Sequence, residues 1–224
     1  MTNTERTTLA ATAITSLAIE VSEPAQASPF YAAVGLADAV GVRASDAPST
    51  GFRGFTLSLV VGQPSTVDSL VGSALEAGAT VLKPVAKSFW GYGGVVRAPD
   101  GTIVKVASSS KKETGPATRR IDDVVLLLGV EDVKAATRFY VERGLSVAKS
   151  FGGRYAEFDT AGSPVKLALY GRRAAAKDAG VDPAGSDSHR LVVIGSVGPI
   201  TDLDGFVWEA PAVRTAGGSP SGDG

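Results

Sequence analysis

Two stretches of the sequence decide the fold: VSEPAQASPFYAAVGL at Val21–Leu36 and VEDVKAATRFYVERGL at Val130–Leu145. Aligned without a gap, they share a valine, an acidic residue two positions later, a Phe-Tyr pair and a Gly-Leu pair, at a constant offset of 109 residues. A second related pair, APDGTIVKV at Ala98–Val106 and DLDGFVWEA at Asp202–Ala210, places an Asp-Gly turn before an apolar strand. The chain therefore consists of two related halves.

The composition of the connecting segments marks the boundaries of these halves. We place the first half at 14–107 and the second at 121–210. The segment 108–120, SSSKKETGPATRR, reads as an exposed linker because it is rich in charged residues, serine, glycine and proline. Residues 1–13 and 211–224 are predicted to be disordered, since the first segment is polar and the second is a Gly/Ser/Asp tail.

Hydrophobic periodicity and helix-end signals give the order of elements inside each half. Strand, helix, strand, strand and strand follow one another in 55–107 and again in 121–171. Prolines at positions 24 and 64 open helices that Gly35 and Gly78 close, because glycine tolerates the left-handed conformation found after a helix. The segments 14–46 and 188–210 read as partial units. The sequence thus predicts an α+β protein of paired βαβββ modules, forming open mixed-sheet barrels from two pseudo-repeated halves.

The pairing of these units has two solutions. The complete units 55–107 and 121–171 can close one barrel together while the partial units complete each other, or each half can form a small barrel of its own. Contacts between 16–21 and 206–210 would favour the first solution.

Composition excludes several kinds of chemistry. The chain has 224 residues and a net charge of -1, which argues against the basic surface of a nonspecific nucleic-acid-binding protein. It contains no cysteine and a single histidine, His189, so thiolate nucleophiles, Cys-ligated metals and two-histidine metal sites are excluded. No secretory signal or membrane span is visible. We therefore expect a cytoplasmic protein, compatible with a homodimer, whose partner is a small molecule and neither nucleic acid nor membrane.

The repeated motifs resemble the vicinal oxygen chelate superfamily, which includes glyoxalase I, extradiol dioxygenases and bleomycin-resistance proteins. The resemblance rests on the FY-x-x-x-GL helix end after V-x-[DE] and on the Asp-Gly turn before the last strand, and it covers residues 14–210. It implies an open barrel whose concave face binds a small molecule, and enzymes in which His, Gln or Glu side chains on the first and last strands hold a divalent metal.

The positions that the resemblance assigns to metal ligands are mostly occupied by other residue types. The first-strand positions hold Ser16 and Val125, and the last-strand positions hold Lys105 and Glu209. Because divalent metals in proteins are held by three or more donor groups, we expect no cofactor and disfavour a catalytic metal. The fallback metal site is His189 with Glu209, completed by Asp187 or water. A lactoylglutathione lyase or an extradiol dioxygenase is accordingly disfavoured.

Three functions remain open. The first is a glyoxalase/bleomycin-resistance-like protein, without metal, that sequesters or detoxifies an organic ligand held by Phe89, Trp90, Tyr92 and Trp208. The second is a lyase or isomerase in which His189 or Glu209 is the base and Lys105 stabilises an oxyanion. The third is a degenerate barrel with a structural role. The sequence leaves open which face of the strand 206–210 points into a pocket, and whether His189 is a strand-end residue at the surface.

Overall fold

The two complete units form one large mixed sheet. The protein is described by a computed structural model that covers residues 14–212, so the predicted disorder of 1–13 and of 213–224 lies outside the described residues. The strand order is β5-β6-β7-β4-β8-β11-β10-β9, and the two units meet where β4 and β8 pair antiparallel. The strands are β4 (Phe55–Val60), β5 (Thr80–Ser88), β6 (Gly91–Arg97), β7 (Ile103–Ser108), β8 (Asp123–Val130), β9 (Ser146–Phe151), β10 (Tyr155–Asp159) and β11 (Lys166–Gly171).

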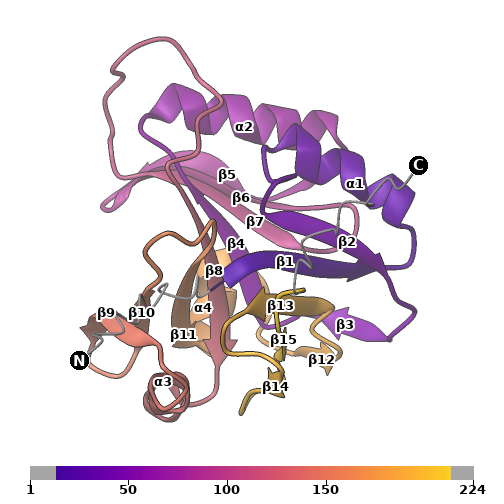
Figure 1. Cartoon of the computed structure of the whole chain (residues 1–224). Coiled ribbons are helices and arrows are strands. Elements are labelled where there is room, and N and C mark those ends of the chain that lie inside the picture. The colour runs from indigo at the N-terminus through magenta and orange to yellow at the C-terminus, as the bar shows by residue number, and fades with distance from the viewer. Residues whose placement is uncertain (1–13, 213–224) are drawn as a thin grey trace, which may run out of the picture.

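The two partial units complete each other in a second, five-stranded sheet. Its order is β14-β15-β13-β1-β2, so strands from the two ends of the chain lie side by side (Figure 1). β1 and β13 pair antiparallel, as β4 and β8 do, with Leu17 opposite Val193. The strands are β1 (Ile14–Val21), β2 (Val40–Ala44), β13 (Leu191–Gly195), β14 (Ile200–Thr201) and β15 (Val207–Glu209). The structure thus adopts the first of the two pairings, although β13 lies between β1 and β15.

Three helices follow the first strands of the units as the sequence predicts. They are α1 (Pro24–Ala33), α2 (Pro64–Glu76) and α3 (Val133–Val141). Gly35 and Gly78 have φ of 76° and 91°, as expected for glycines that end α1 and α2. α1 and α2 cover one side of the molecule together (Figure 1). The α+β class and the βαβββ order are therefore confirmed, with open mixed sheets that do not close into barrels.

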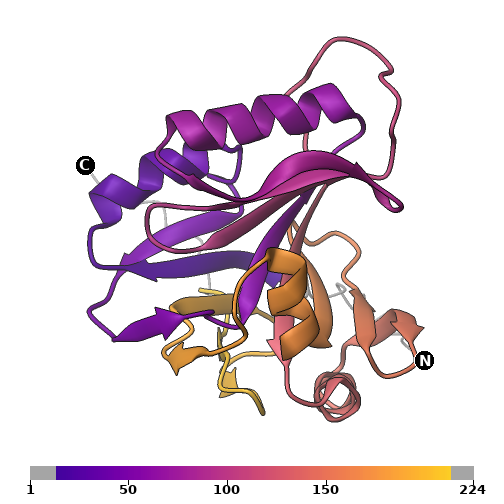
Figure 2. The same ribbon diagram turned by 180° about the vertical axis from the view of Figure 1, so that it is seen from behind.

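A fourth helix, α4 (Arg172–Ala179), is absent from the sequence prediction and packs on the eight-stranded sheet (Figure 2). Its buried side chains are the alanines at positions 175, 176 and 179, which pack in one cluster with Leu127 and Ala168 of β8 and β11. The side chain of Lys83 donates to the carbonyl oxygens of Lys177 and Asp178, at 2.8 and 2.7 Å, near the end of the helix. α4 therefore fills the middle of the sheet face opposite α2.

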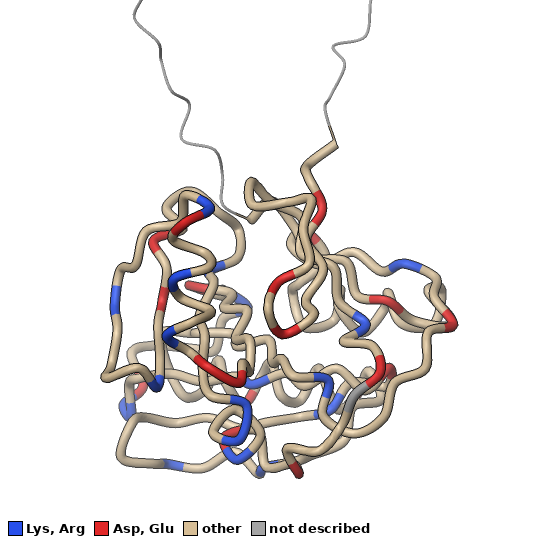
Figure 3. Tube along the Cα trace, turned by 90° about the horizontal axis from the view of Figure 1, so that it is seen from below, with Lys and Arg blue, Asp and Glu red and all other residues tan. Residues whose placement is uncertain are grey.

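The connection that follows α4 contains the short strand β12 (Gly185–Asp187), which pairs with β3 (Ser49–Gly51) from the connection between β2 and β4. None of the helices within residues 14–212 is long and apolar enough to cross a membrane. Cationic and anionic residues are interspersed along the described trace (Figure 3), in line with the near-zero net charge.

The two repeated motifs prove to be hydrogen-bond partners across the two sheets. The Tyr31 hydroxyl at the end of α1 donates to Asp100 Oδ2 at 2.6 Å, in the turn between β6 and β7. Likewise, the Tyr140 hydroxyl of α3 donates to Asp202 Oδ2 at 2.5 Å, in the turn before β15. Burial, together with the neighbouring carboxylate, raises the pKa of both tyrosines. Each helix of one sheet is thus tied to a turn of the other.

Candidate functional site

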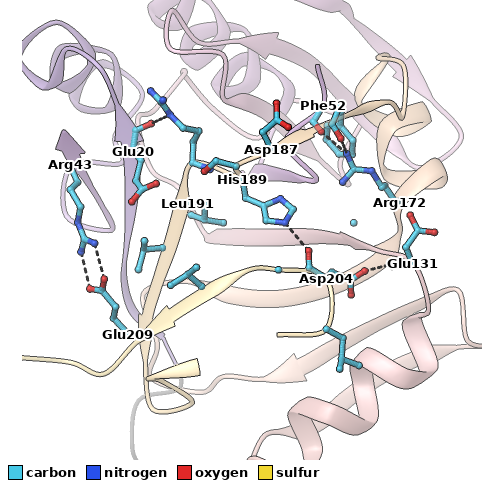
Figure 4. A pocket seen from close by; sticks show the side chains of 18 residues that line it. Glu20, Arg43, Phe52, Glu131, Arg172, Asp187, His189, Leu191, Asp204 and Glu209 are labelled. Atoms are coloured by element: carbon cyan, nitrogen blue, oxygen red, sulfur yellow. Dashed lines mark hydrogen bonds and ion pairs between the residues drawn. The ribbon is translucent and has the colours of Figure 1, made fainter. Parts of the chain in front are cut away.

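A pocket of about 660 Å³ lies on the five-stranded sheet, and its lining includes both His189 and Glu209, which lie apart in it (Figure 4). Four strands of this sheet, β1, β2, β13 and β15, contribute residues to the lining. Successive residues of a strand point to opposite faces of a sheet. On β15, Val207 and Glu209 line the pocket, whereas Trp208 is buried in the core. Phe206, which directly precedes the strand, is also buried. The face of this strand that the sequence left undecided is thereby settled.

One side of the pocket carries a bidentate, partly exposed ion pair between Arg43 of β2 and Glu209 of β15. Arg43 Nη1 and Nη2 donate to Glu209 Oε1 and Oε2, respectively, each at 2.8 Å. Since β1 and β13 lie between these two strands, the pair reaches over both of them, across three strand spacings of roughly 4.8 Å. The hydrogen bonds from Arg43 lower the pKa of Glu209 and raise that of Arg43 itself. The ion pair with Arg43 therefore favours the ionised form of Glu209.

His189 is held in place by contacts with the backbone. Its ring stacks on Phe206, with centroids 3.8 Å apart and planes 18° apart. Nδ1 lies 2.5 Å from the Arg53 carbonyl oxygen, and Nε2 lies 2.9 Å from that of Asp204. Both ring nitrogens thus face backbone acceptors (the Asp204 contact is drawn in Figure 4), so His189 positions the loop that bears Asp204.

Asp204 is a site residue that the sequence reasoning missed. Its Oδ1 accepts a hydrogen bond from the Glu131 backbone N–H at 2.7 Å, and burial raises its pKa, with Asp202 and Glu131 adding to the effect. The sequence signal for Asp204 is its place in the Asp-Gly turn before the last strand, which also marks the repeat. Asp204 is the half-buried carboxyl group of the pocket.

The other two guanidinium groups of the pocket donate hydrogen bonds to backbone carbonyl oxygens. Arg172 Nη2 donates to the carbonyl oxygens of Phe52 and Gly185, both at 2.7 Å, and Arg190 Nε donates to that of Glu20 at 3.0 Å. These bonds fix the walls of the pocket. Arg43, by contrast, binds the side-chain carboxylate of Glu209.

The donor set of the pocket does not fit a divalent metal. The first-strand position holds Ser16, both oxygens of Glu209 accept from Arg43, and both nitrogens of His189 face carbonyl oxygens. Within residues 14–212, no group of three or more His, Cys, Asp or Glu side chains is arranged to hold a metal ion. The fallback site of His189, Glu209 and Asp187 is not assembled as a ligand cluster.

Lys105 lies in a different place from the other two predicted catalytic residues. It stands on β7 of the eight-stranded sheet, where its Nζ pairs with Asp178 Oδ2 of α4 at 2.7 Å. It lines a second, smaller pocket and does not line the pocket of His189 and Glu209. The structure therefore does not bring the base and the oxyanion-stabilising cation of the predicted lyase together.

The four predicted ligand-binding aromatic residues are also dispersed. Phe89 and Trp90 lie at the β5–β6 connection with 85% and 83% of their surface exposed. The Tyr92 hydroxyl donates to Asp68 of α2, whereas Trp208 is buried in the core and donates from Nε1 to the Tyr140 hydroxyl at 3.1 Å. Trp90 and Tyr92 line the same small pocket as Lys105, and Trp208 lies behind the larger one.

Comparison with known proteins shows which solved structures share this fold. No protein-family model and no curated protein sequence matches the chain. A mutant of glyoxalase I from Zea mays is 12% identical and superposes with a TM-score of 0.56, covering 88% of this chain and 92% of that one. Another structure of glyoxalase I from Zea mays is 10% identical, with a TM-score of 0.52 over 82% of this chain and 74% of its own. The chain therefore shares the glyoxalase-like fold that the resemblance of the motifs implied.

Proposed function

We propose that this protein binds a small organic molecule in the pocket of the five-stranded sheet, without a divalent metal, and so sequesters or detoxifies it. The observation that carries the proposal is the Arg43–Glu209 pair in the pocket lining. Glu209 stands where the fold family would place a metal ligand, and a guanidinium group supplies the positive charge there instead. Arg43 is suited to this role because its planar fork matches a carboxylate and stays charged at all physiological pH values.

The lining of the pocket favours a neutral or cationic ligand. Five carboxylates and three guanidinium groups surround it, and two of those guanidinium groups are committed to backbone carbonyl oxygens. Leu191, Val192 and Val207 supply apolar surface beside the ion pair. A volume of about 660 Å³ falls within the range of roughly 300–1,000 Å³ typical of small-molecule sites. An organic molecule with an apolar body and a polar or cationic group matches this lining.

The proposal is tested by a thermal-shift screen of aromatic natural products and α-oxo aldehydes, followed by mass spectrometry of the recovered compound. We expect a neutral or cationic compound to raise the Tm of the wild-type protein and to be recovered unchanged. The same compound should raise the Tm of Glu209→Gln much less, because the positive charge of Arg43 in the lining is then unpaired.

Glu142→Gln is the matched control, since Glu142 is an exposed carboxylate at the end of α3. A hit that shifts wild type, Glu209→Gln and Glu142→Gln equally would rule out this pocket as the site. Turnover of the compound would show an enzyme instead, and a screen without any hit would leave the structural role that the sequence also allowed.

A further inference from the structure

The eight-stranded sheet carries a second hollow, of about 340 Å³, that the proposed function does not use. α4 packs on β4, β8 and β11 and so covers the middle of the sheet face. The hollow lies beyond the helix, over β5, β6 and β7, and its lining includes Trp90, Lys105 and Asp178. We call this hollow the β5–β7 slot.

Trp90 forms one end of the slot and is strongly exposed. A tryptophan with 83% of its surface in water is unusual, because an indole ring normally buries most of its area. Its ring is braced edge-on by Phe89, with centroids 5.0 Å apart and planes 89° apart. The exposed indole therefore offers a preformed stacking surface for a flat ring.

Two ammonium groups form the other end of the slot. Lys105 Nζ contacts Asp178 Oδ2 at 2.7 Å, and Lys83 Nζ donates to the carbonyl oxygens of Lys177 and Asp178. An ammonium group has three N–H donors, so Lys105 retains two and Lys83 retains one that bind no acceptor within the described residues. With two lysines against one carboxylate, this end of the slot is cationic. Lys87 is a third lysine in the lining.

The spacing of the two ends fits a ligand of two fused rings with an acidic group. Lys105 lies opposite Val95 in the sheet, and Trp90 directly precedes Gly91 at the start of β6. Gly91 and Val95 are four residues apart along β6, or roughly 13 Å at the rise of a β-strand. The lining between them includes Ala86, Gly93 and Ala107, where two methyl groups and a glycine without a side chain leave room for a flat molecule.

We propose that the β5–β7 slot binds a planar aromatic anion, with its ring stacked on Trp90 and its carboxylate on the ammonium groups of Lys83 and Lys105. This ligand class has the opposite charge preference to that of the pocket on the five-stranded sheet. The protein would then bind two different kinds of small molecule, one on each sheet.

The test is an NMR titration with 2-naphthoate that observes the indole N–H signals. The chain has two tryptophans, so two such signals are expected, and Trp90→Phe assigns them. We expect a saturable shift of the Trp90 signal, while the buried Trp208 signal stays in place. The neutral analogue 2-naphthamide should bind at least tenfold more weakly, because it lacks the charge that the lysines recognise.

Lys105→Met should weaken 2-naphthoate binding by a similar factor. Lys166→Met is the matched control, because Lys166 is also an ion-paired lysine of this sheet, bound to Asp123 at 2.7 Å. Glu209→Gln should leave 2-naphthoate binding unchanged, which separates this test from that of the proposed function. An unmoved Trp90 signal, equal affinity for acid and amide, or an equal loss in Lys166→Met would each overturn the proposal.

Discussion

At the scale of single residues, the ion pair between Arg43 and Glu209 makes the protein sensitive to acid. Because the folded-state pKa of Glu209 is below the usual 4.5, the pair contributes stability above that pH. This contribution is lost as the pH falls from 4.5 through the lower pKa of the folded protein. Both side chains are 42% exposed, so the effect is that of a solvent-screened pair.

We therefore expect Glu209→Gln to lower the free energy of unfolding at pH 7 and to lower it less at pH 3. Urea unfolding of wild type and variant at both pH values measures this difference. A variant that loses the same stability at both pH values would show that ionisation of Glu209 is not involved.

A second residue-scale prediction concerns the buried hydroxyl of Tyr140. It donates to Asp202 and accepts from Trp208 Nε1, so Tyr140→Phe leaves both partners short of a hydrogen bond. We expect a loss of about 1–3 kcal/mol in the free energy of unfolding. Tyr170→Phe is the control, since the Tyr170 hydroxyl makes no side-chain hydrogen bond within residues 14–212. Equal stability of the two variants would contradict the proposed link between the sheets.

At the scale of secondary-structure elements, α4 shows where sequence reasoning ends. The longer strands and the first three helices could be predicted because apolar residues alternate or recur at helical spacing and prolines and glycines mark the ends. The short strands β3, β12 and β14, of two or three residues, were not predicted because they are too short to show a pattern. The sequence of α4, RRAAAKDA, has alanine as its only apolar residue. It therefore lacks the periodic pattern of large apolar side chains that would predict a helix. Which alanines of α4 are buried depends on its packing against the sheet, where it contacts Leu127 and Ala168.

The packing of α4 is tested by enlarging one of its alanines. Ala176 is completely buried, so Ala176→Leu should cost about 1–3 kcal/mol of stability through overpacking against the sheet. Lys177→Leu introduces the same side chain at an exposed position of the same helix and should change stability little. Denaturant unfolding distinguishes the two. A fully stable Ala176→Leu variant would mean that the helix does not lie against the sheet in solution.

At the scale of the whole molecule, the sequence identified useful residues but not their grouping. His189 and Glu209 share one pocket, whereas Lys105 and Trp90 share another on the other sheet. Arg43 could not be singled out because its partner is 166 residues away and becomes a neighbour only when the two ends of the chain form one sheet. Site geometry in this fold depends on which units pair, and local sequence signals do not encode that choice.

We propose that the pocket of the five-stranded sheet works with an ion pair in place of a metal. The most direct measurement is elemental analysis of wild-type protein purified without chelators, together with the thermal shift of a screened ligand before and after EDTA treatment. We expect only substoichiometric divalent metal and a ligand-induced shift in Tm that EDTA leaves unchanged. One divalent metal per chain that disappears in Glu209→Gln, with a ligand shift abolished by EDTA, would contradict it.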